Sequence, residues 1–577
     1  MVCLIIIWGL VIYANSLKGE FIWDDNGLIK NNVYLRDVKN IPGFFTRDMG
    51  LGSSVKSNFY RPLQMSVNML NYSLWGLNER GYHLVSVGLH IIAGLCLFWL
   101  VCILFSDKLL ASLTAVLFVA HPAHTEAIDY IAGVSDPMSA LFMLLSLVFY
   151  AKSVYSNKLK LFILSLLNFI FALLAKENSI ILPFLLLLIN YILKKKIKIS
   201  YFLSFAVILI LYIVLRINIV GFVPPSLPSL AGLFVRIPSF FAAISEYARI
   251  LFLPFDLRLQ YSNKTFGFFD TKVLIGMAVL SVVVVISYLR RKNDRLMFFS
   301  AFWFFICLLP VSNIFVISYP FMMEHWVYFS SCGFFLFIGH LAVNYLRTRK
   351  LRILAGIVVA GMVIIWSVLT IRQHRYWRNP AALYQRAIKY DPDNWLFYNG
   401  LALAFQDKGK NSEAVEAYKK AISINQNESK LYYNLSSLYQ SMGRQEEAIV
   451  SYKQGREIDV KSAQYYYEAC KKYLEAGKSA EAVGSFNRAL ELAPNNISVY
   501  LELGNTYIIA GKYKDAIALL KKVLKIAPNL SVAYNNLAAA YYYGKQYDLA
   551  IENCNKAIGL GYKVAPVFLE LLRPYKK

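Results

Sequence analysis

Apolar runs that are long enough, or nearly long enough, to cross a lipid bilayer follow one another through the first 370 residues. A spanning helix needs about 20 apolar residues. Eleven runs approach that length, at residues 1–17, 82–105, 109–126, 136–151, 159–175, 178–193, 199–217, 271–289, 296–316, 326–346 and 353–371. With 57% hydrophobic residues, the chain is more apolar than a typical soluble protein. We therefore expect an all-α, polytopic domain at residues 1–375 with the lipid bilayer around it.

Basic clusters between these runs predict the orientation of the spans. They lie at residues 152–160, 194–198, 290–295 and 347–352, and cytoplasmic loops of membrane proteins are enriched in Lys and Arg. If all four clusters are cytoplasmic, every polar motif described below is external or lumenal, and so is the C-terminal part of the chain. The apolar stretch 234–255 must then lie on the membrane surface, re-enter the membrane or form a pair of spans. Because much of the net charge of +25 lies in these clusters, we expect no nucleic-acid partner.

A 34-residue repeat fills the polar remainder, which we assign to a second domain at residues 380–577. Small residues recur at Ala414, Ala448, Ala482, Ala516 and Ala550, and Pro494 and Pro528 close two of the repeats. Thirty-four residues is the tetratricopeptide period. We expect about five helical pairs after a leading half-repeat, stacked into an α-solenoid that binds a protein or peptide. Alternatively, the array packs on its own membrane loops or on a second copy.

Two adjacent carboxylates, Asp24 and Asp25, stand shortly after the first apolar run. Acidic groups near a membrane are costly and mark functional sites. One use for such a pair is as a general base that takes the proton of an acceptor hydroxyl. The alternative is that one of them caps an interfacial helix.

Further short motifs follow this pair on the predicted external side. In chain order they are Trp23-Asp24-Asp25, Phe59-Tyr60-Arg61-Pro62-Leu63, His121-Pro122-Ala123-His124-Thr125-Glu126-Ala127, Ala175-Lys176-Glu177-Asn178, and Glu324-His325-Trp326-Val327-Tyr328 with Gly333. Their order, followed by repeats, resembles the transmembrane and tetratricopeptide-repeat-containing O-mannosyltransferases, which are C-type membrane glycosyltransferases. The resemblance covers nearly the whole chain. It implies transfer of mannose or a similar hexose from a polyprenyl-phosphate carrier to a Ser or Thr hydroxyl, with Asp24 or Asp25 as the base.

A lipid-phosphate donor needs cations or hydrogen-bond donors at the membrane surface to stabilise the leaving phosphate. The candidates are Arg61, Lys176, His325 and Arg249. The alternative for Arg61 is support of its loop, and for Lys176 it is a local ion pair with Glu177. We expect a polar network around the acceptor or donor that includes His121, His124, Glu126, Asp136, Glu177, Glu324 and Tyr328.

A divalent metal at His121, His124 and Glu126 is an alternative to this network, since two imidazoles and a carboxylate suit Zn²⁺ or Mn²⁺. Two positions depart from the family pattern. Ser135 precedes Asp136, and His325 follows Glu324, where relatives usually carry Arg. Either Arg61 and Lys176 therefore bind more of the donor phosphate, or the donor is not polyprenyl-phosphate mannose.

Two other functions compete with the transferase. A membrane-anchored repeat scaffold for envelope or secretion assembly explains the repeats but not the many spans. A ligase or polymerase of lipid-linked glycans would concentrate its polar residues in a large late loop, whereas residues 317–325 are few. The single repeat block favours a bacterial plasma membrane with periplasmic repeats over an endoplasmic reticulum membrane with lumenal repeats.

Overall fold

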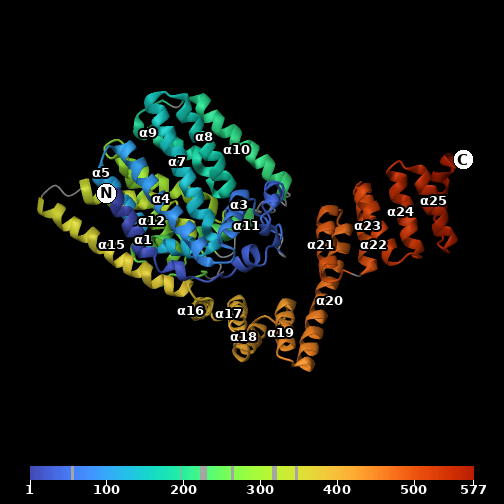
Figure 1. Ribbon diagram of the computed structural model, residues 1–577. Helices are drawn as coiled ribbons and strands as arrows, with labels where there is room; N and C mark the ends of the chain where they lie inside the picture. Colours follow the sequence, from blue (N-terminus) through green and yellow to red (C-terminus); the bar gives the residue numbers. More distant parts are fainter. Residues whose placement is uncertain are drawn as a thin grey trace. The chain divides into compact units, whose positions relative to one another are not determined.

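The computed structural model describes residues 1–53, 57–196, 198–220, 230–261, 266–314, 321–344, 349–494 and 496–576. Within these ranges the regular structure is helical, without a strand (Figure 1). The chain divides into two compact units, Met1–Ala404 and Phe405–Lys577. The first two helices of the expected repeat domain, α16 (Pro380–Tyr390) and most of α17 (Trp395–Asp407), thus belong to the first unit by their contacts.

An apolar helix lies at every one of the eleven predicted runs. These helices are α1 (Val2–Tyr13), α4 (Glu79–Phe105), α5 (Lys108–Ala120), α7 (Ser135–Ser156), α8 (Leu159–Ala175), α9 (Leu182–Leu193), α10 (Ile199–Val220), α12 (Thr271–Arg290), α13 (Arg295–Leu308), α14 (Ser331–Asn344) and α15 (Arg349–Trp377). Five helical stretches in the described residues are long and apolar enough to cross a membrane, in α4, α7, α10, α12 and α15. The other six are shorter, so the count of eleven spans remains a prediction.

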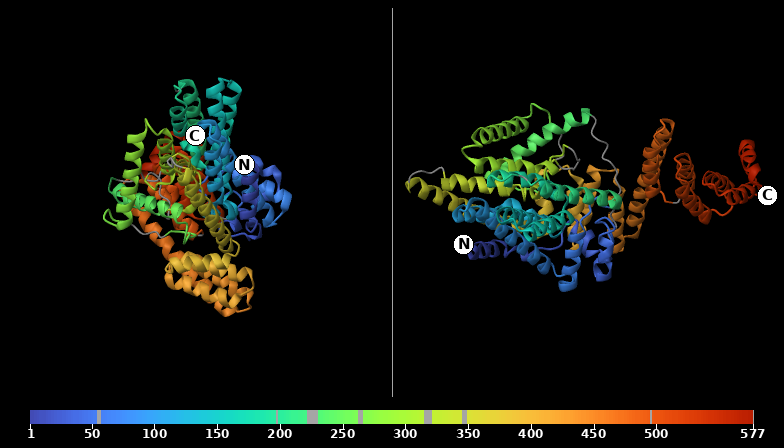
Figure 2. Two further views of the ribbon diagram at one scale, coloured as in Figure 1. Left: turned by 90° about the vertical axis from the view of Figure 1, so that its left-hand side faces the viewer. Right: turned by 90° about the horizontal axis from the view of Figure 1, so that it is seen from above.

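Helix α7 forms the centre of the first unit. In its most apolar stretch 89% of the residues are buried, against 11% in α10 and 17% in α12. Helices α4 and α8 pack on α7, and α5 packs on α4 (Figures 1 and 2). The outer helices therefore carry the surface suited to lipid, while α7 is shielded by protein.

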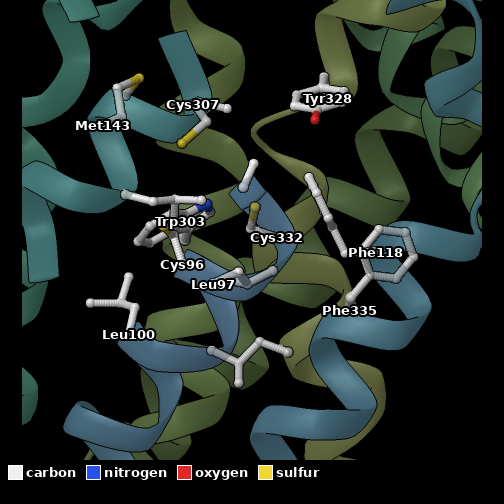
Figure 3. Close-up of a cluster of buried hydrophobic side chains, with 14 of the residues drawn as sticks. Cys96, Leu97, Leu100, Phe118, Met143, Trp303, Cys307, Tyr328, Cys332 and Phe335 are labelled. Atoms are coloured by element: carbon white, nitrogen blue, oxygen red, sulfur yellow. The ribbon is translucent and has the colours of Figure 1, made fainter. Parts of the chain in front are cut away.

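A buried cluster joins α4, α5, α7, α13 and α14, with Trp303 and Phe118 among its members (Figure 3). Gly333 lies where α14 approaches α13, and a Cβ atom there would come within 2.5 Å of the Ser300 carbonyl oxygen. Glycine is needed because the two backbones are so close. This gives a packing reason for the glycine that closes the last external motif.

Helix α11 (Leu230–Phe252) covers most of the stretch expected to lie on or re-enter the membrane. It is not among the helices long and apolar enough to span, and it packs on α12. Glu246 of α11 pairs with both Arg249 and Lys272. Its predicted placement at the membrane surface is compatible with these charges.

The segments predicted to be external fold into short helices. They are α2 (Ile41–Phe44), α3 (Pro62–Trp75), η5 (Pro122–His124), α6 (Thr125–Asp129), η6 (Ile131–Val134), η7 (Glu177–Ile181) and η9 (Glu324–Val327).

The repeat helices follow the 34-residue period over most of the array. After α17 they are α18 (Asn411–Ile424), α19 (Ser429–Ser441), α20 (Gln445–Glu475), α21 (Ser479–Leu492), α22 (Ile497–Ile509), α23 (Tyr513–Ile526), α24 (Ser531–Tyr543), α25 (Tyr547–Gly559) and α26 (Pro566–Leu572). The five repeat alanines are all buried, as expected. The turn glycines at 409, 443, 477 and 511 have φ between +70° and +76°, which L side chains adopt poorly.

Helix α20 departs from the predicted helical pairs. Its 31 residues cover the second helix of one repeat and the first helix of the next. Pro494 and Pro528 follow α21 and α23 by two residues, but the position 34 residues before Pro494 is Val460. Proline removes a backbone donor and clashes with the preceding turn, whereas valine lets the helix continue. The expectation of separate pairs is therefore wrong at this junction.

Val460→Pro is expected to break α20 into two helices near residue 459. A proline in a helix interior costs about 3 kcal/mol. Hydrogen exchange of the full-length protein should become faster at residues 456–464 and unchanged in α23. Val460→Ala is the control and should leave exchange as in the wild type. Equal protection in the proline variant would contradict this explanation of α20.

Candidate functional site

Residues 121–136, which we call the central segment, form the middle of the candidate site. Every residue in it is buried except Tyr130, which is partly buried. Buried polar groups need partners, and those of this segment find them in distant parts of the chain. The partners come from the first loop, α3, the α8–η7 turn, η9 and α15.

Asp25 is an anchoring residue between the first loop and the central segment. Its side chain is fully buried, and its two carboxylate oxygens accept hydrogen bonds from the backbone N–H groups of Ile22 at 3.0 Å and Ala132 at 2.7 Å. Burial raises the pKa of Asp25 to about 8, although these two hydrogen bonds lower it. Because the side chain is fully buried and both oxygens are held by backbone N–H groups, Asp25 is not placed to meet a substrate in this arrangement.

Asp24 has the opposite environment. It is exposed, and the Tyr130 hydroxyl donates to its Oδ2 at 2.9 Å. Partial loss of water around the carboxyl raises the pKa of Asp24, and the hydrogen bond from Tyr130 lowers it. A carboxylate that reaches solvent and has a raised pKa is suited to accept a proton.

Two ion pairs join further motif residues to one another. Arg61 donates to both carboxylate oxygens of Glu177, at 2.9 and 2.5 Å, and Lys176 pairs with Asp136 at 2.6 Å. The predicted local pair between Lys176 and Glu177 is not the one observed, because each residue bonds across to another element. All four side chains are mostly buried.

The segment that carries Arg61 is connected through η6 to the loop that carries Asp24 and Asp25. Gln64, three residues after Arg61, donates to the Ala132 carbonyl oxygen at 2.7 Å. The N–H of the same Ala132 is bonded to Asp25. One residue of η6, Ala132, thus hydrogen-bonds both to α3 and to Asp25.

A second acidic group joins the central segment to η9. Glu126 accepts a hydrogen bond from the His325 backbone N–H at 2.8 Å and pairs with the His325 ring at 2.9 Å. Glu324 is fully buried and accepts from the Tyr261 hydroxyl at 2.8 Å and the Arg258 N–H at 2.5 Å. Burial and the neighbouring Glu126 raise the pKa of Glu324.

Helix α16 packs on the segment that contacts Glu324. The Arg386 guanidinium donates to the Leu257 carbonyl oxygen at 3.0 Å, and the Tyr390 hydroxyl donates to Asp256 at 2.7 Å. Arg258 lies over the Tyr390 ring at 4.4 Å. The leading half-repeat is thereby part of the framework that holds residues 256–261 against Glu324.

His121 and His124 have their ring nitrogens engaged by protein. His121 contacts the Leu251 carbonyl oxygen and the Ala123 N–H, and His124 contacts the Phe118 carbonyl oxygen and the Ser331 hydroxyl. Among the described residues there is no group of three or more His, Cys, Asp or Glu that could hold a metal. The two rings bond to these protein groups and do not converge with Glu126 on a common point.

The two remaining predicted residues, Arg249 and Tyr328, lie on α11 and directly after η9. Arg249 donates to Glu246 at 2.7 Å and to the Phe255 carbonyl oxygen. Tyr328 is buried, and its hydroxyl oxygen lies 2.7 Å from Nδ1 of His90.

Sequence inspection missed one buried pair. The Asp129 carboxylate lies 2.5 Å from the His374 ring, and both are almost completely buried. Asp129 follows Glu126 by three residues, on the same helix, and His374 sits between arginines at the end of the last apolar run. The three-residue spacing of Glu126 and Asp129 indicates two acids on one helical face. His374 gives no such signal, because it lies among the basic residues that follow the last apolar run.

Comparison with known proteins gives matches along most of the chain. Tetratricopeptide-repeat families match residues 383–416, 404–443, 429–459, 473–541 and 531–560. A protein O-mannosyl-transferase of Caenorhabditis elegans is 24% identical over 427 residues, which is 70% of this chain and 60% of that protein. Human protein O-mannosyl-transferase TMTC1 is 37% identical over 147 residues, 24% of this chain and 17% of its own length.

The chain is similar to the protein O-mannosyl-transferases. The resemblance predicted from the motifs is thereby confirmed. The chain spans 60% of the length of the nematode relative and less of the human one. Among solved structures, the crystal structure of MamA protein covers 30% of this chain and all of that chain, at 24% identity and a TM-score of 0.17.

The two positions at which the sequence departs from the O-mannosyltransferase pattern, Ser135 and His325, lie beside buried pairs. Asp136, which follows Ser135, pairs with Lys176. His325 pairs with Glu126. These two buried acids of the central segment thus each have a basic partner.

Lys176→Met is expected to lower the free energy of unfolding by about 3 to 5 kcal/mol, because it leaves the Asp136 carboxylate buried and unpaired. The double variant Lys176→Met with Asp136→Leu should regain most of that loss. Unfolding of the purified protein in detergent measures both. An additive double variant would mean that the two side chains do not interact.

Proposed function

We propose that this protein is an integral-membrane glycosyltransferase that moves mannose or a similar hexose from a polyprenyl-phosphate carrier to a Ser or Thr hydroxyl of a protein. The observation that carries the proposal is the exposed Asp24 carboxylate, which accepts a hydrogen bond from Tyr130 of the central segment. The buried cation Lys176 pairs with Asp136 of the same segment. The similarity to proteins named O-mannosyl-transferases supports it.

Asp24 is the base in this proposal, and Asp25 positions it. The Asp24 carboxylate takes the proton of the acceptor hydroxyl, and the freed oxygen forms a bond to the anomeric carbon of the sugar. The bond from that carbon to the phosphate oxygen breaks, and its electron pair leaves with polyprenyl phosphate. Asp25 holds the loop through Ile22 and Ala132, so that Asp24 stays at the surface.

The leaving phosphate would bind at Arg61 and Lys176. Both cations are already paired with acids, so the phosphate oxygens would share them with Glu177 and Asp136. Arg61 is suited to this because its planar guanidinium can donate to several oxygens at once. His325 and Arg249 are further donors in the proposal, each also paired with a carboxylate.

The repeats would hold the acceptor protein. Repeat solenoids of this type offer an extended surface for peptides. Helix α16 packs on residues 256–261, which ties the start of the array to the unit that carries Asp24. In the proposed topology the repeats and Asp24 share the external or lumenal face, and both a bacterial plasma membrane and the endoplasmic reticulum membrane satisfy that requirement.

The first competing function is a membrane-anchored scaffold, which predicts that Asp24 is dispensable. The second is a ligase or polymerase of lipid-linked glycans, which would pass the sugar to another glycan. The acceptor that receives label from a lipid-linked sugar distinguishes the second from a protein glycosyltransferase.

Asp24→Asn is expected to keep the fold and reduce transfer by about 10² to 10⁴-fold, the usual contribution of a general base. The assay is transfer of radiolabel from polyprenyl-phosphate mannose, and from other lipid-linked hexoses, to protein in purified membranes. Asp25→Asn is the matched comparison. It should lower stability by about 1 to 3 kcal/mol, since one of two buried N–H groups loses its acceptor. Full activity in Asp24→Asn would overturn Asp24 as the base.

The pH dependence gives an independent test. Because the base must be deprotonated, kcat/KM should fall as pH drops through the raised pKa of Asp24. Tyr130→Phe removes the hydrogen bond that lowers this pKa, so its acid limb should move to higher pH. An acid limb that stays in place would mean that Tyr130 does not act on the base.

A further inference from the structure

Trp23 has an unusual backbone conformation. Its φ is +50°, in the left-handed region. Among described residues other than glycine, positive φ is found at Ser, Asn, Lys and Asp positions, and Trp23 is the aromatic one. A bulky residue adopts this conformation only against steric strain, and such strain is typical of active sites and ligand-binding positions.

The indole of Trp23 is part of a stack of aromatic rings. It lies on the Tyr130 ring, with centroids 5.8 Å apart and planes at 27°, and Tyr130 in turn stacks on Trp377 at 6.4 Å and 30°. Trp377 is buried, whereas 36% of Trp23 is exposed. One end of the stack, Trp377, is therefore held inside the protein, and the other end, the Trp23 indole, is accessible.

The same stack contacts the carboxylate proposed as the base. The Tyr130 hydroxyl is bonded to Asp24, and Asp24 is the next residue after Trp23. An exposed indole and an exposed carboxylate are thus held side by side by one tyrosine. A pyranose ring combines a face of C–H groups, which packs on an aromatic ring, with hydroxyl groups at its edge.

We infer that Trp23 is a sugar-binding residue, on which the hexose of the lipid-linked donor stacks while its anomeric carbon lies near Asp24. This rests on the proposed function, since the sugar next to the base is the one being transferred. Productive transfer requires the reacting atoms to be held within about 3 to 3.5 Å. A rigid platform beside the base would supply that constraint for the sugar.

The alternative is that Trp23 anchors the loop in the membrane interface, where Trp is enriched. An anchor needs neither a left-handed backbone nor a stack that includes the partner of Asp24. Trp75, at the end of α3, is 42% exposed and is a matched control for an external tryptophan.

The test compares two dissociation constants of the purified full-length protein, for polyprenyl-phosphate mannose and for sugar-free polyprenyl phosphate. Their ratio reports the contribution of the sugar. The wild type should bind the sugar-bearing lipid more tightly. Trp23→Leu should raise the dissociation constant of the sugar-bearing lipid about tenfold, as expected for loss of an aromatic contact. The dissociation constant of the sugar-free lipid should not change. Trp23→Phe should fall between the two, and Trp75→Leu should match the wild type.

Trp23→Gly guards against a folding defect, because glycine adopts positive φ without strain. It should lose the preference for the sugar-bearing lipid while remaining folded. A wild-type ratio of one, or an unchanged ratio in both Trp23→Leu and Trp23→Gly, would overturn the inference. Equally weakened binding of both lipids would also overturn the inference and would favour Trp23 as a membrane anchor of the loop. If the ratio falls but the wild type transfers no sugar to protein, the sugar site stands and the proposed transferase fails.

Discussion

The burial of acidic residues in the central segment is the constraint on which the rest of the membrane unit depends. Glu126, Asp129 and Asp136 are all withdrawn from water. A buried carboxylate needs a cation or several donors, and these three find theirs on η9, α15 and the α8–η7 turn. Elements separated by up to about 245 residues in sequence are brought together in this way.

These pairs are better explained as determinants of arrangement than of stability. Replacing a buried ion pair with well-packed apolar residues is often neutral or stabilising, whereas removing one partner is costly. The central segment therefore accepts only an arrangement in which every acid meets its own partner. That arrangement leaves Asp24 at the surface and Asp25 inside, although the two are neighbours in sequence.

Much of the fold could be predicted from periodicity. Long apolar runs can satisfy their backbone only as helices, and a helix lies at each of them. The repeat period placed alanines such as Ala414 and Ala516 in the core, where they lie. Val460 shows the limit of the method, because one missing proline joins two repeat helices into one.

The site was harder to predict than the fold. The order of the motifs singled out segments that contact one another in the structure, but pairing depends on where side chains point. Lys176 and Glu177 are adjacent in sequence and bond to different elements. The environments of Asp24 and Asp25 depend on Ala132 and Tyr130, which lie more than 100 residues away. His374 could not be separated from its basic neighbours without the fold.

The most direct measurement is an experimental structure of the full-length protein with a non-transferable phosphonate analogue of a polyprenyl-phosphate hexose. The account predicts that the phosphonate contacts Arg61 or Lys176 and that the sugar lies beside Asp24. An analogue bound with its headgroup away from the first loop, with Asp24 still bonded only to Tyr130, would contradict the account.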